Sequence, residues 1–204
     1  MEQTIQNLLQ FTPDIAVKDK HKNIQAIHFD YSGHVVATNG HVLFATKKPF
    51  EMKKAGKTFS SSEIKKGVTT ESIHEFPEWK KAIPSECARK IKLTIPKWFS
   101  MFKKTEEDVT LVLDYKNVDD PFFKVSKCTS ETSLGINAKY LSCFAGEEVS
   151  VLLSSPTSAA VITKKDSKID PHSNKFEDEV LSEEWFYLLM PIRLDEAVSE
   201  VMYM

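Results

Sequence analysis

Short apolar runs, each about the length of one strand, recur along this sequence and are bounded by turn-forming residues. Residues 24–29, 42–46 and 149–153 are rich in β-branched and aromatic side chains, which favour strands. Glycine- or asparagine-containing turn signals follow at residues 30–33 and 38–40, where the backbone can take a positive φ. Because tight turns reverse the chain, these runs predict antiparallel sheets.

A few short helices are predicted between the strands. Residues 4–11 carry their apolar side chains on one side of a helix. Pro96 opens a second short helix, and Asn137 caps a third, which Gly146 ends. Further strands are predicted at residues 34–37, 57–60, 90–95, 109–115, 122–127, 133–136, 159–163 and 185–190, and an exposed acidic loop at residues 164–184.

These elements follow a strand–helix–strand–strand order about three times, without a matching repeat of sequence. The pattern predicts a repeated unit of strands and short helices. The chain has 204 residues, of which 41% are hydrophobic, and this is enough for one large domain or two small ones. Charged residues make up 27%, which is typical of a globular chain and not of a disordered one.

Neither a membrane span nor a secretory signal is expected. No apolar run approaches the roughly 20 residues that a spanning helix needs, and the first residues lack a basic start followed by an apolar stretch. Cys87, Cys128 and Cys143 are odd in number and show no CxxC spacing. This pattern favours a reducing compartment and argues against a disulfide framework or a zinc site, so a cytoplasmic protein is expected.

Charge is distributed unevenly along the chain. Residues 1–104 hold 18 Lys and Arg against 10 Asp and Glu, and residues 105–204 hold 9 against 19, which add up to the 27 and 29 of the whole chain. The basic part is a candidate surface for nucleic acid phosphates. Attraction between the two halves, within a chain or between subunits, explains the pattern equally well, and so do lysines that simply solvate loops.

The motifs of the common enzyme classes are absent from the sequence. It has no GxxxxGK[ST], GxGxxG, GxSxG or HExxH, and its six histidines are scattered. The pair Asp119 and Asp120 precedes Pro121 in a turn-like setting, without a partner that could complete a catalytic group. The sequence therefore predicts no enzyme activity, no metal site and no cofactor.

Three segments together resemble the bacterial DNA polymerase III beta subunit, the sliding clamp. Residues 37–43 read ATNGHVL, where the clamp family has ATDGHRL. Residues 76–84 read FPEWKKAIP, similar to the family's FPDYRRVLP, and residues 187–194 read YLLMPIRL, close to the family's YVVMPMRL. Each motif is short, but the three occur in the family's order and in a matching context of strands and helices.

In the clamp family these segments line one hydrophobic cleft, which takes short peptide motifs of polymerases and other replication proteins. The resemblance implies a cleft with an adaptable apolar wall, where a histidine and an arginine orient the polar end of the peptide. An ordinary core strand would also explain the alternation in residues 190–194. The implied cleft residues are Ile24, Thr38, Gly40, His41, Leu43, Pro77, Ala82, Met190, Pro191, Ile192, Arg193 and Leu194.

The resemblance also implies a DNA clamp-like α+β fold with antiparallel sheets and helices on one face. It implies a non-enzymatic protein with a first unit at residues 1–84 and a second at 85–204. Family clamps are longer, with three domains per chain, and encircle double-stranded DNA without sequence specificity. A chain of this length would need more subunits to close such a ring as a homo-oligomer. The alternative is a monomeric regulator that binds replication proteins without encircling DNA. The lysines expected to contact DNA are Lys47, Lys48, Lys53, Lys54 and Lys57.

Overall fold

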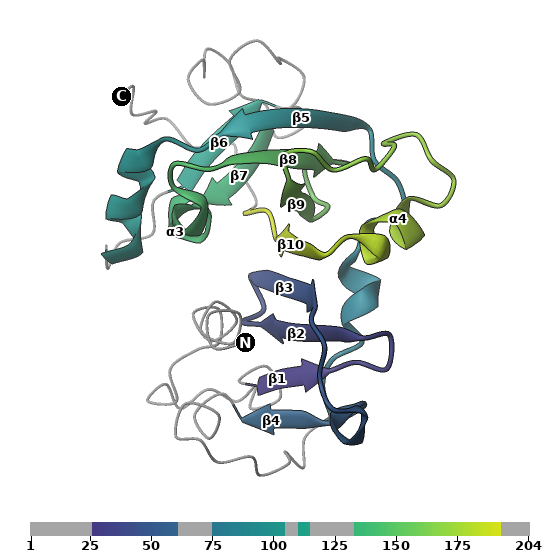
Figure 1. Ribbon diagram of the computed structural model, residues 1–204. Coiled ribbons are helices and arrows are strands. Elements are labelled where there is room, and N and C mark those ends of the chain that lie inside the picture. The colour runs from purple at the N-terminus through teal and green to yellow at the C-terminus, as the bar shows by residue number, and fades with distance from the viewer. Residues whose placement is uncertain (1–25, 61–74, 105–109, 115–132, 193–204) are drawn as a thin grey trace. The chain divides into compact units, whose positions relative to one another are not determined.

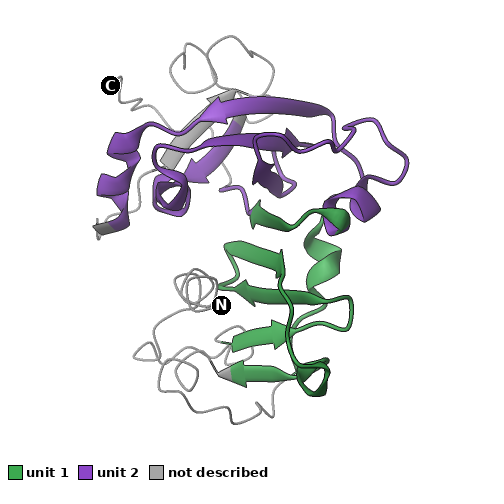
Figure 2. Cartoon of the chain, in the orientation of Figure 1, with its two compact units in different colours: residues 1–83, 182–188 green, residues 84–181, 189–204 purple. Residues whose placement is uncertain are grey.

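A computed structural model describes residues 26–60, 75–104, 110–114 and 133–192 (Figure 1). The chain divides into two compact units (Figure 2). Unit 1 comprises residues 1–83 together with 182–188, and unit 2 comprises residues 84–181 and 189–204. A short stretch near the end of the chain therefore completes the unit that the beginning of the chain starts.

Unit 1 is an antiparallel sheet whose turns are those expected from the sequence. Strands β1 and β2 pair with Ile27 opposite Ala37, and the turn between them contains Gly33 at a φ of +85°. The strands predicted in this part of the chain are thus confirmed. In spatial order they are β4 (Thr58–Ser60), β1 (Ala26–Phe29), β2 (His34–Thr38), β3 (Val42–Lys47) and β10 (Trp185–Leu189).

One face of the unit 1 sheet carries an aromatic core. Ile27 and Phe29 alternate on β1, so both side chains lie on the same face, where they pack with buried residues of β2 and β4. Phe29 makes edge contacts with Phe59 at 5.5 Å and with Phe50 at 5.1 Å between ring centroids. Full burial of such a side chain contributes about 1.5–3 kcal/mol, so this cluster holds the edge strand β4 on the sheet.

The other face of β2 is covered by a 3₁₀ helix. All five β2 residues are buried, which requires cover on both faces of the strand. On the second face His34 lies edge-on to Trp79 of helix η3 (Trp79–Ala82), with 5.6 Å between the ring centroids, and to Phe186 at 6.0 Å. The segment that begins at residue 75 therefore folds back onto the hairpin of unit 1.

Unit 2 contains two antiparallel sheets. Strand β8 (Glu148–Leu153) pairs with β5 (Arg89–Thr94) on one side and with β9 (Ala160–Lys164) on the other. The separate pair is β6 (Thr110–Asp114) and β7 (Ser133–Asn137). These elements confirm the predicted strands at residues 90–95, 109–115, 133–136, 149–153 and 159–163, whereas the predictions at 4–11 and 122–127 lie outside the described residues.

Short helices follow the first strand of each predicted repeat in unit 2. After β5 comes the 3₁₀ helix η4 (Lys97–Lys104), and after β7 come α3 (Ala138–Leu141) and η5 (Ser142–Phe144). The Asn137 side chain accepts a hydrogen bond of 2.9 Å from the Lys139 backbone N–H, which confirms the predicted cap. The order β7, α3, β8, β9 reproduces the expected strand–helix–strand–strand pattern, and the fold class is α+β as predicted.

The expectation of an exposed loop at residues 164–184 is wrong in part. Helix α4 (Phe176–Ser182) lies there, and its Phe176 and Val180, four residues apart on one helix face, are buried. Ile169 is also buried, and the Lys90 ammonium donates hydrogen bonds to the backbone carbonyls of Ser167 at 2.6 Å and Ile169 at 3.0 Å. Because charged residues dominate this stretch of sequence, its pattern did not indicate the small apolar helix face. It also did not indicate the two backbone carbonyls that bind Lys90.

Candidate functional site

The predicted cleft residues 38–43 form one self-contained turn in unit 1. The Asn39 side-chain oxygen accepts hydrogen bonds from the backbone N–H groups of His41 and Val42, both at 3.0 Å. The Thr38 hydroxyl donates to the Val42 carbonyl at 2.7 Å and accepts from the Gly40 N–H at 3.1 Å. Gly40 has a φ of +85°, which other residues rarely adopt. The motif therefore holds a rigid loop.

The ends of this loop are buried, and its middle is exposed. Thr38 and Leu43 are buried at 8% and 3% exposure, whereas Gly40 and His41 face solvent. A side chain as buried as that of Leu43 has little surface to offer a ligand. Of the predicted residues in this turn, His41 has an exposed side chain, and its role in orienting a peptide stays a prediction.

The second predicted segment is anchored by a residue that the sequence analysis did not select. Trp79 is buried, and its indole N–H donates a hydrogen bond of 3.1 Å to the Asp30 carboxylate. Pro77 at the start of this segment is exposed, and Ala82 at its end is half-buried. The Trp79 anchor thus presents both predicted residues at the surface of unit 1.

The described cleft residues of the third predicted segment, residues 190–192, belong to unit 2. Met190 and Pro191 are half-buried, and Ile192 is 37% exposed. The Ile192 N–H donates a hydrogen bond of 2.8 Å to the Gly135 carbonyl in β7, which fixes the backbone of this segment. Ile24, Arg193 and Leu194 lie outside the described residues, so the cleft as a whole stays a prediction.

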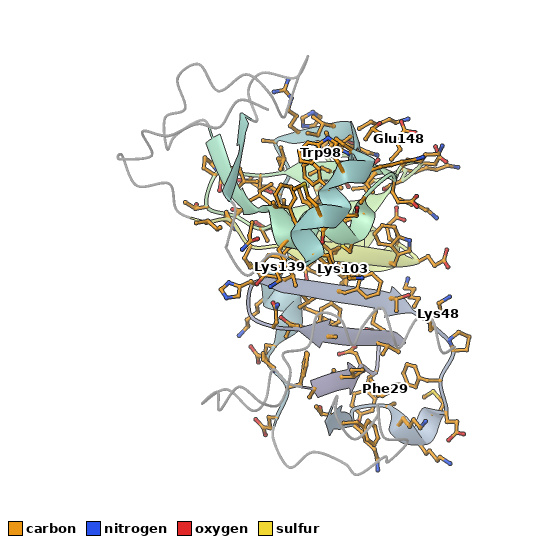
Figure 3. All side chains as sticks on the ribbon, turned by 90° about the vertical axis from the view of Figure 1, so that its left-hand side faces the viewer. Phe29, Lys48, Trp98, Lys103, Lys139 and Glu148 are labelled. Atoms are coloured by element: carbon orange, nitrogen blue, oxygen red, sulfur yellow. The ribbon has the colours of Figure 1, made fainter. Side chains whose placement is uncertain are left out.

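The lysines predicted to contact DNA occupy the connection from β3 through the 3₁₀ helix η2 (Met52–Lys54) to β4 in unit 1. The Lys47 ammonium donates a hydrogen bond of 3.0 Å to the Ser182 carbonyl, while Lys48 is exposed. The Lys53 ammonium lies 2.7 Å from the Glu51 carboxylate, and the Lys54 ammonium lies 5.9 Å from the centre of the Phe29 ring. Figure 3 labels Lys48 and Phe29, both in this unit. Lys57 follows in the same connection, directly before β4.

Asp30 is the centre of a hydrogen-bond cluster that the sequence analysis missed. Its carboxylate accepts from the Ser32 N–H at 2.8 Å and from the Ser32 hydroxyl, and it lies 3.2 Å from the Lys80 ammonium. Burial by itself would raise the pKa of Asp30, but the hydrogen bonds from Ser32, Trp79 and Lys80 outweigh it and hold that pKa well below its usual range. His28, whose Nε2 is 3.7 Å from the carboxylate, has its pKa lowered mainly by burial.

This cluster ties the turn after β1 to helix η3, through Trp79 and Lys80. The Ser32 hydroxyl lies between the Asp30 carboxylate and the ring Nδ1 of His34, 2.8 Å from the latter. The His28 ring joins the Asp30 carboxylate, 3.7 Å from its Nε2, to the Thr58 hydroxyl, 3.0 Å from its Nδ1. Thr58 is only 6% exposed, so this hydroxyl has little surface to offer a substrate. Within the residues that the structure describes, no group of three or more His, Cys, Asp or Glu side chains could hold a metal ion. No helix in that part is long and apolar enough to cross a membrane.

The helices of unit 2 present a second mixed surface. In a 3₁₀ helix, residues three apart lie above one another, and in η4 this places Phe99 and Phe102 in a buried column. Trp98 and Met101 form the neighbouring column and are 38% and 57% exposed. Helices α3 and η4 contact each other, and Figure 3 labels Trp98, Lys103 and Lys139 in this part.

Comparison with known proteins gives a fold and no closer relative. No protein-family profile matches the sequence, and no curated protein does either. Among solved structures, a beta sliding clamp of Caulobacter crescentus matches with a TM-score of 0.60 and 16% identity, covering 95% of this chain and 64% of the clamp chain. This is the fold of the bacterial beta sliding clamp. The strand order and the short helices of both units are thus those of a clamp-like chain.

Clamps from other bacteria match equally well. The DnaN sliding clamp of Bartonella birtlesii aligns with a TM-score of 0.60 and 18% identity over 94% of this chain and 65% of the clamp. The Helicobacter pylori beta clamp aligns with a TM-score of 0.58 and 15% identity over 94% of this chain and 64% of the clamp. The chain therefore spans less than two thirds of the length of these clamps, and the expected resemblance is confirmed at the level of fold.

Proposed function

We propose that this protein is a non-enzymatic, clamp-like processivity factor for DNA replication in the cytoplasm. It binds short peptide motifs of DNA polymerase or other replication proteins in a hydrophobic cleft and encircles double-stranded DNA as a homo-oligomer. The observation that carries the proposal is the clamp fold over 95% of the chain. The three clamp-like motifs add support, because they fall in that fold as a rigid turn, an anchored 3₁₀ segment and the residues that follow the last strand.

Ligand binding by clamps of this fold supports the cleft. The Bartonella birtlesii clamp was solved bound to griselimycin and the Helicobacter pylori clamp in complex with carprofen. In this chain the accessible apolar candidates are Met190, Pro191 and Ile192, and His41 supplies a polar group. A flexible thioether beside branched apolar groups suits a site that accepts several related peptides.

Substitution of the accessible apolar residues tests the cleft. Met190→Ala and Ile192→Ala should each weaken binding of a clamp-binding peptide about 10- to 30-fold, since buried apolar anchors dominate the affinity of peptide grooves. The measurement is isothermal titration calorimetry with the full chain. Met52→Ala is the matched control, because Met52 is 77% exposed and lies outside the predicted cleft. A wild-type protein without affinity for such peptides would remove the cleft from the proposal.

DNA contact should be salt-dependent and independent of sequence. With about five phosphate contacts, doubling the salt concentration should weaken binding to duplex DNA roughly 20-fold, because each contact releases condensed counterions. Lys47→Gln with Lys48→Gln should make this dependence less steep, whereas Lys164→Gln with Lys168→Gln, also exposed, should leave it unchanged. The measurement is anisotropy of a labelled duplex that is closed at both ends, so that a ring cannot slide off. Equal affinity at both salt concentrations would contradict an electrostatic interface.

A monomeric regulator of replication proteins is the second candidate. It is favoured by the coverage of 64% of the clamp chain, because a ring of such chains needs a different number of subunits from the family's ring. Mass in solution, measured by light scattering, separates the two candidates. A closed oligomer supports the encircling clamp, and a monomer that still binds the peptide supports the regulator.

A further inference from the structure

The side chain of Tyr31 is unusually placed for an aromatic residue. It projects from the turn between β1 and β2 and is 81% exposed. Its ring lies directly over Gly56, where a Cβ atom would be only 2.4 Å from the ring carbon Cζ. The backbone at Gly56 therefore supports the ring from one side, while most of its surface is open to solvent. A supported and exposed aromatic ring is a suitable platform for stacking.

The segment below the ring is firmly held. The Gly56 N–H donates a hydrogen bond of 2.6 Å to the Phe29 carbonyl, and the Phe29 N–H donates one of 2.9 Å to the Lys57 carbonyl. Within the segment, the N–H groups of Lys54 and Ala55 donate to carbonyls three residues earlier, at 2.8 and 3.0 Å. These bonds tie the connection between β3 and β4 to the end of β1, so the platform is preorganised.

The segment that supports the Tyr31 ring is rich in lysine. Residues 47–57 contain five lysines and one glutamate. Lys48 is exposed, and the Lys53 side chain is 77% exposed. The neighbouring residue Met52 is also 77% exposed. The Lys53–Glu51 ion pair is itself exposed and therefore weak, so a phosphate can compete for this lysine. We call the exposed residues Tyr31, Met52, Lys48 and Lys53, together with the half-buried Lys54, the Tyr31 patch.

We propose that the Tyr31 patch binds single-stranded nucleic acid. One base stacks on the open face of the Tyr31 ring, the Met52 thioether contacts its edge, and the lysines hold the neighbouring phosphates. Stacking platforms combined with cationic side chains are the usual means by which proteins bind single strands without sequence preference. An acidic peptide matches the charge of the patch equally well, but only an unpaired base also supplies a planar π-face for the ring.

This inference goes beyond the proposed clamp function. Lys48, Lys53 and Lys54 also belong to the proposed duplex-binding surface, so the Tyr31 variants, and not the lysine variants, distinguish the two proposals. The patch lies entirely in the first sixty residues, and it includes no residue of the predicted peptide cleft. Binding at the patch also requires no closed ring, because a single strand can approach an exposed surface. A protein without peptide binding would therefore leave the Tyr31 proposal intact. A protein without single-strand binding would likewise leave the proposed peptide cleft intact.

Single-strand binding by the full chain tests the proposal. The probe is a fluorescently labelled thymidine oligonucleotide of about 12 nucleotides, within the ~4–16 that such sites cover, and the readout is anisotropy at low salt. Wild type should bind it more tightly than a duplex of equal length. Tyr31→Ala should weaken binding about 10-fold, consistent with a stacking contribution in the range of ~1–3 kcal/mol per base. Tyr31→Phe, which keeps the ring, should bind like wild type.

Two further variants separate stacking from general charge. Gly56→Ala should also weaken single-strand binding, because the new methyl group displaces the Tyr31 ring; its φ of +75° adds strain that circular dichroism can monitor. Lys48→Gln should weaken binding, whereas Lys168→Gln, a matched exposed lysine in unit 2, should not. The same affinity for wild type and Tyr31→Ala would overturn the proposal. So would Tyr31-dependent binding of an acidic peptide by a protein that does not bind the oligonucleotide.

Discussion

Replacing Phe186 with alanine should lower the free energy of unfolding by about 3–5 kcal/mol. The side chain is fully buried in β10, and its ring lies 6.0 Å from His34 and 6.2 Å from Trp79 between centroids. Its loss leaves a cavity where the returning strand meets the covered face of β2. A domain of this size has a total stability of roughly 5–15 kcal/mol, so a large fraction of that stability depends on one ring.

Urea unfolding followed by tryptophan fluorescence measures this effect, with Trp79 as the nearest reporter. Phe186→Leu serves as the matched control and should cost clearly less, because much of the apolar volume is kept. If the free energy of unfolding of Phe186→Ala lies within about 1 kcal/mol of the wild-type value, the packing of β10 contributes little to the stability of unit 1.

Replacing Asp30 with alanine should lower the free energy of unfolding by about 2–3 kcal/mol. The change removes a charged acceptor and leaves the Trp79 N–H, the Ser32 N–H and the Lys80 ammonium without it. Hydrogen bonds to charged groups contribute about 1.5–3 kcal/mol each, and water can replace part of the loss at this half-buried position. Asp166→Ala, at an exposed position after β9, should change the stability by less than about 0.5 kcal/mol.

The Asp30 effect should also depend on pH. Because the pKa of Asp30 is lower in the folded than in the unfolded protein, its contribution is complete above the ordinary pKa of 3.8. It is lost as the pH falls below that value and through the folded-state pKa, since the unfolded chain then binds more protons. The difference in melting temperature between wild type and Asp30→Ala should therefore shrink below pH 3.8. A constant difference from neutral to strongly acidic pH would contradict the assignment of the ionised carboxylate.

Local patterns were sufficient for the strands and turns. The β-branched and aromatic side chains in 24–29 and 42–46 and the glycines at the turns express backbone preferences that act over a few residues. The sequence therefore predicts these strands and turns well. Helix α4 was not predicted, because Phe176 and Val180 are the buried residues of its apolar face and many charged residues surround them in the sequence. Its acidic first turn, which favours a helix N-terminus, was the available signal.

The candidate site was less predictable, for a physical reason. Asp30 and Trp79 are 49 residues apart, and nothing in either neighbourhood signals the hydrogen bond that joins them. Exposure is equally nonlocal: Thr38 and Leu43 look like cleft residues in the motif, yet both are buried in the structure. Tyr31 and Gly56 show the same limit, because a stacking platform depends on two turns that meet only after the strands have paired.

The return of β10 to unit 1 has a consequence for synthesis on the ribosome. Thr46 and Lys47 at the end of β3 bind the Glu184 carbonyl, and Thr46 and Glu184 are separated by 138 residues. At about 5–20 residues per second, translation of that interval takes roughly 7–28 seconds. Throughout it, β3 is an unpaired edge that can recruit a strand from another nascent chain. The four lysines at positions 48–57, which follow β3, leave the ribosome early in this interval. They repel like-charged copies on the same polysome, which protects the open edge until its partner strand is made.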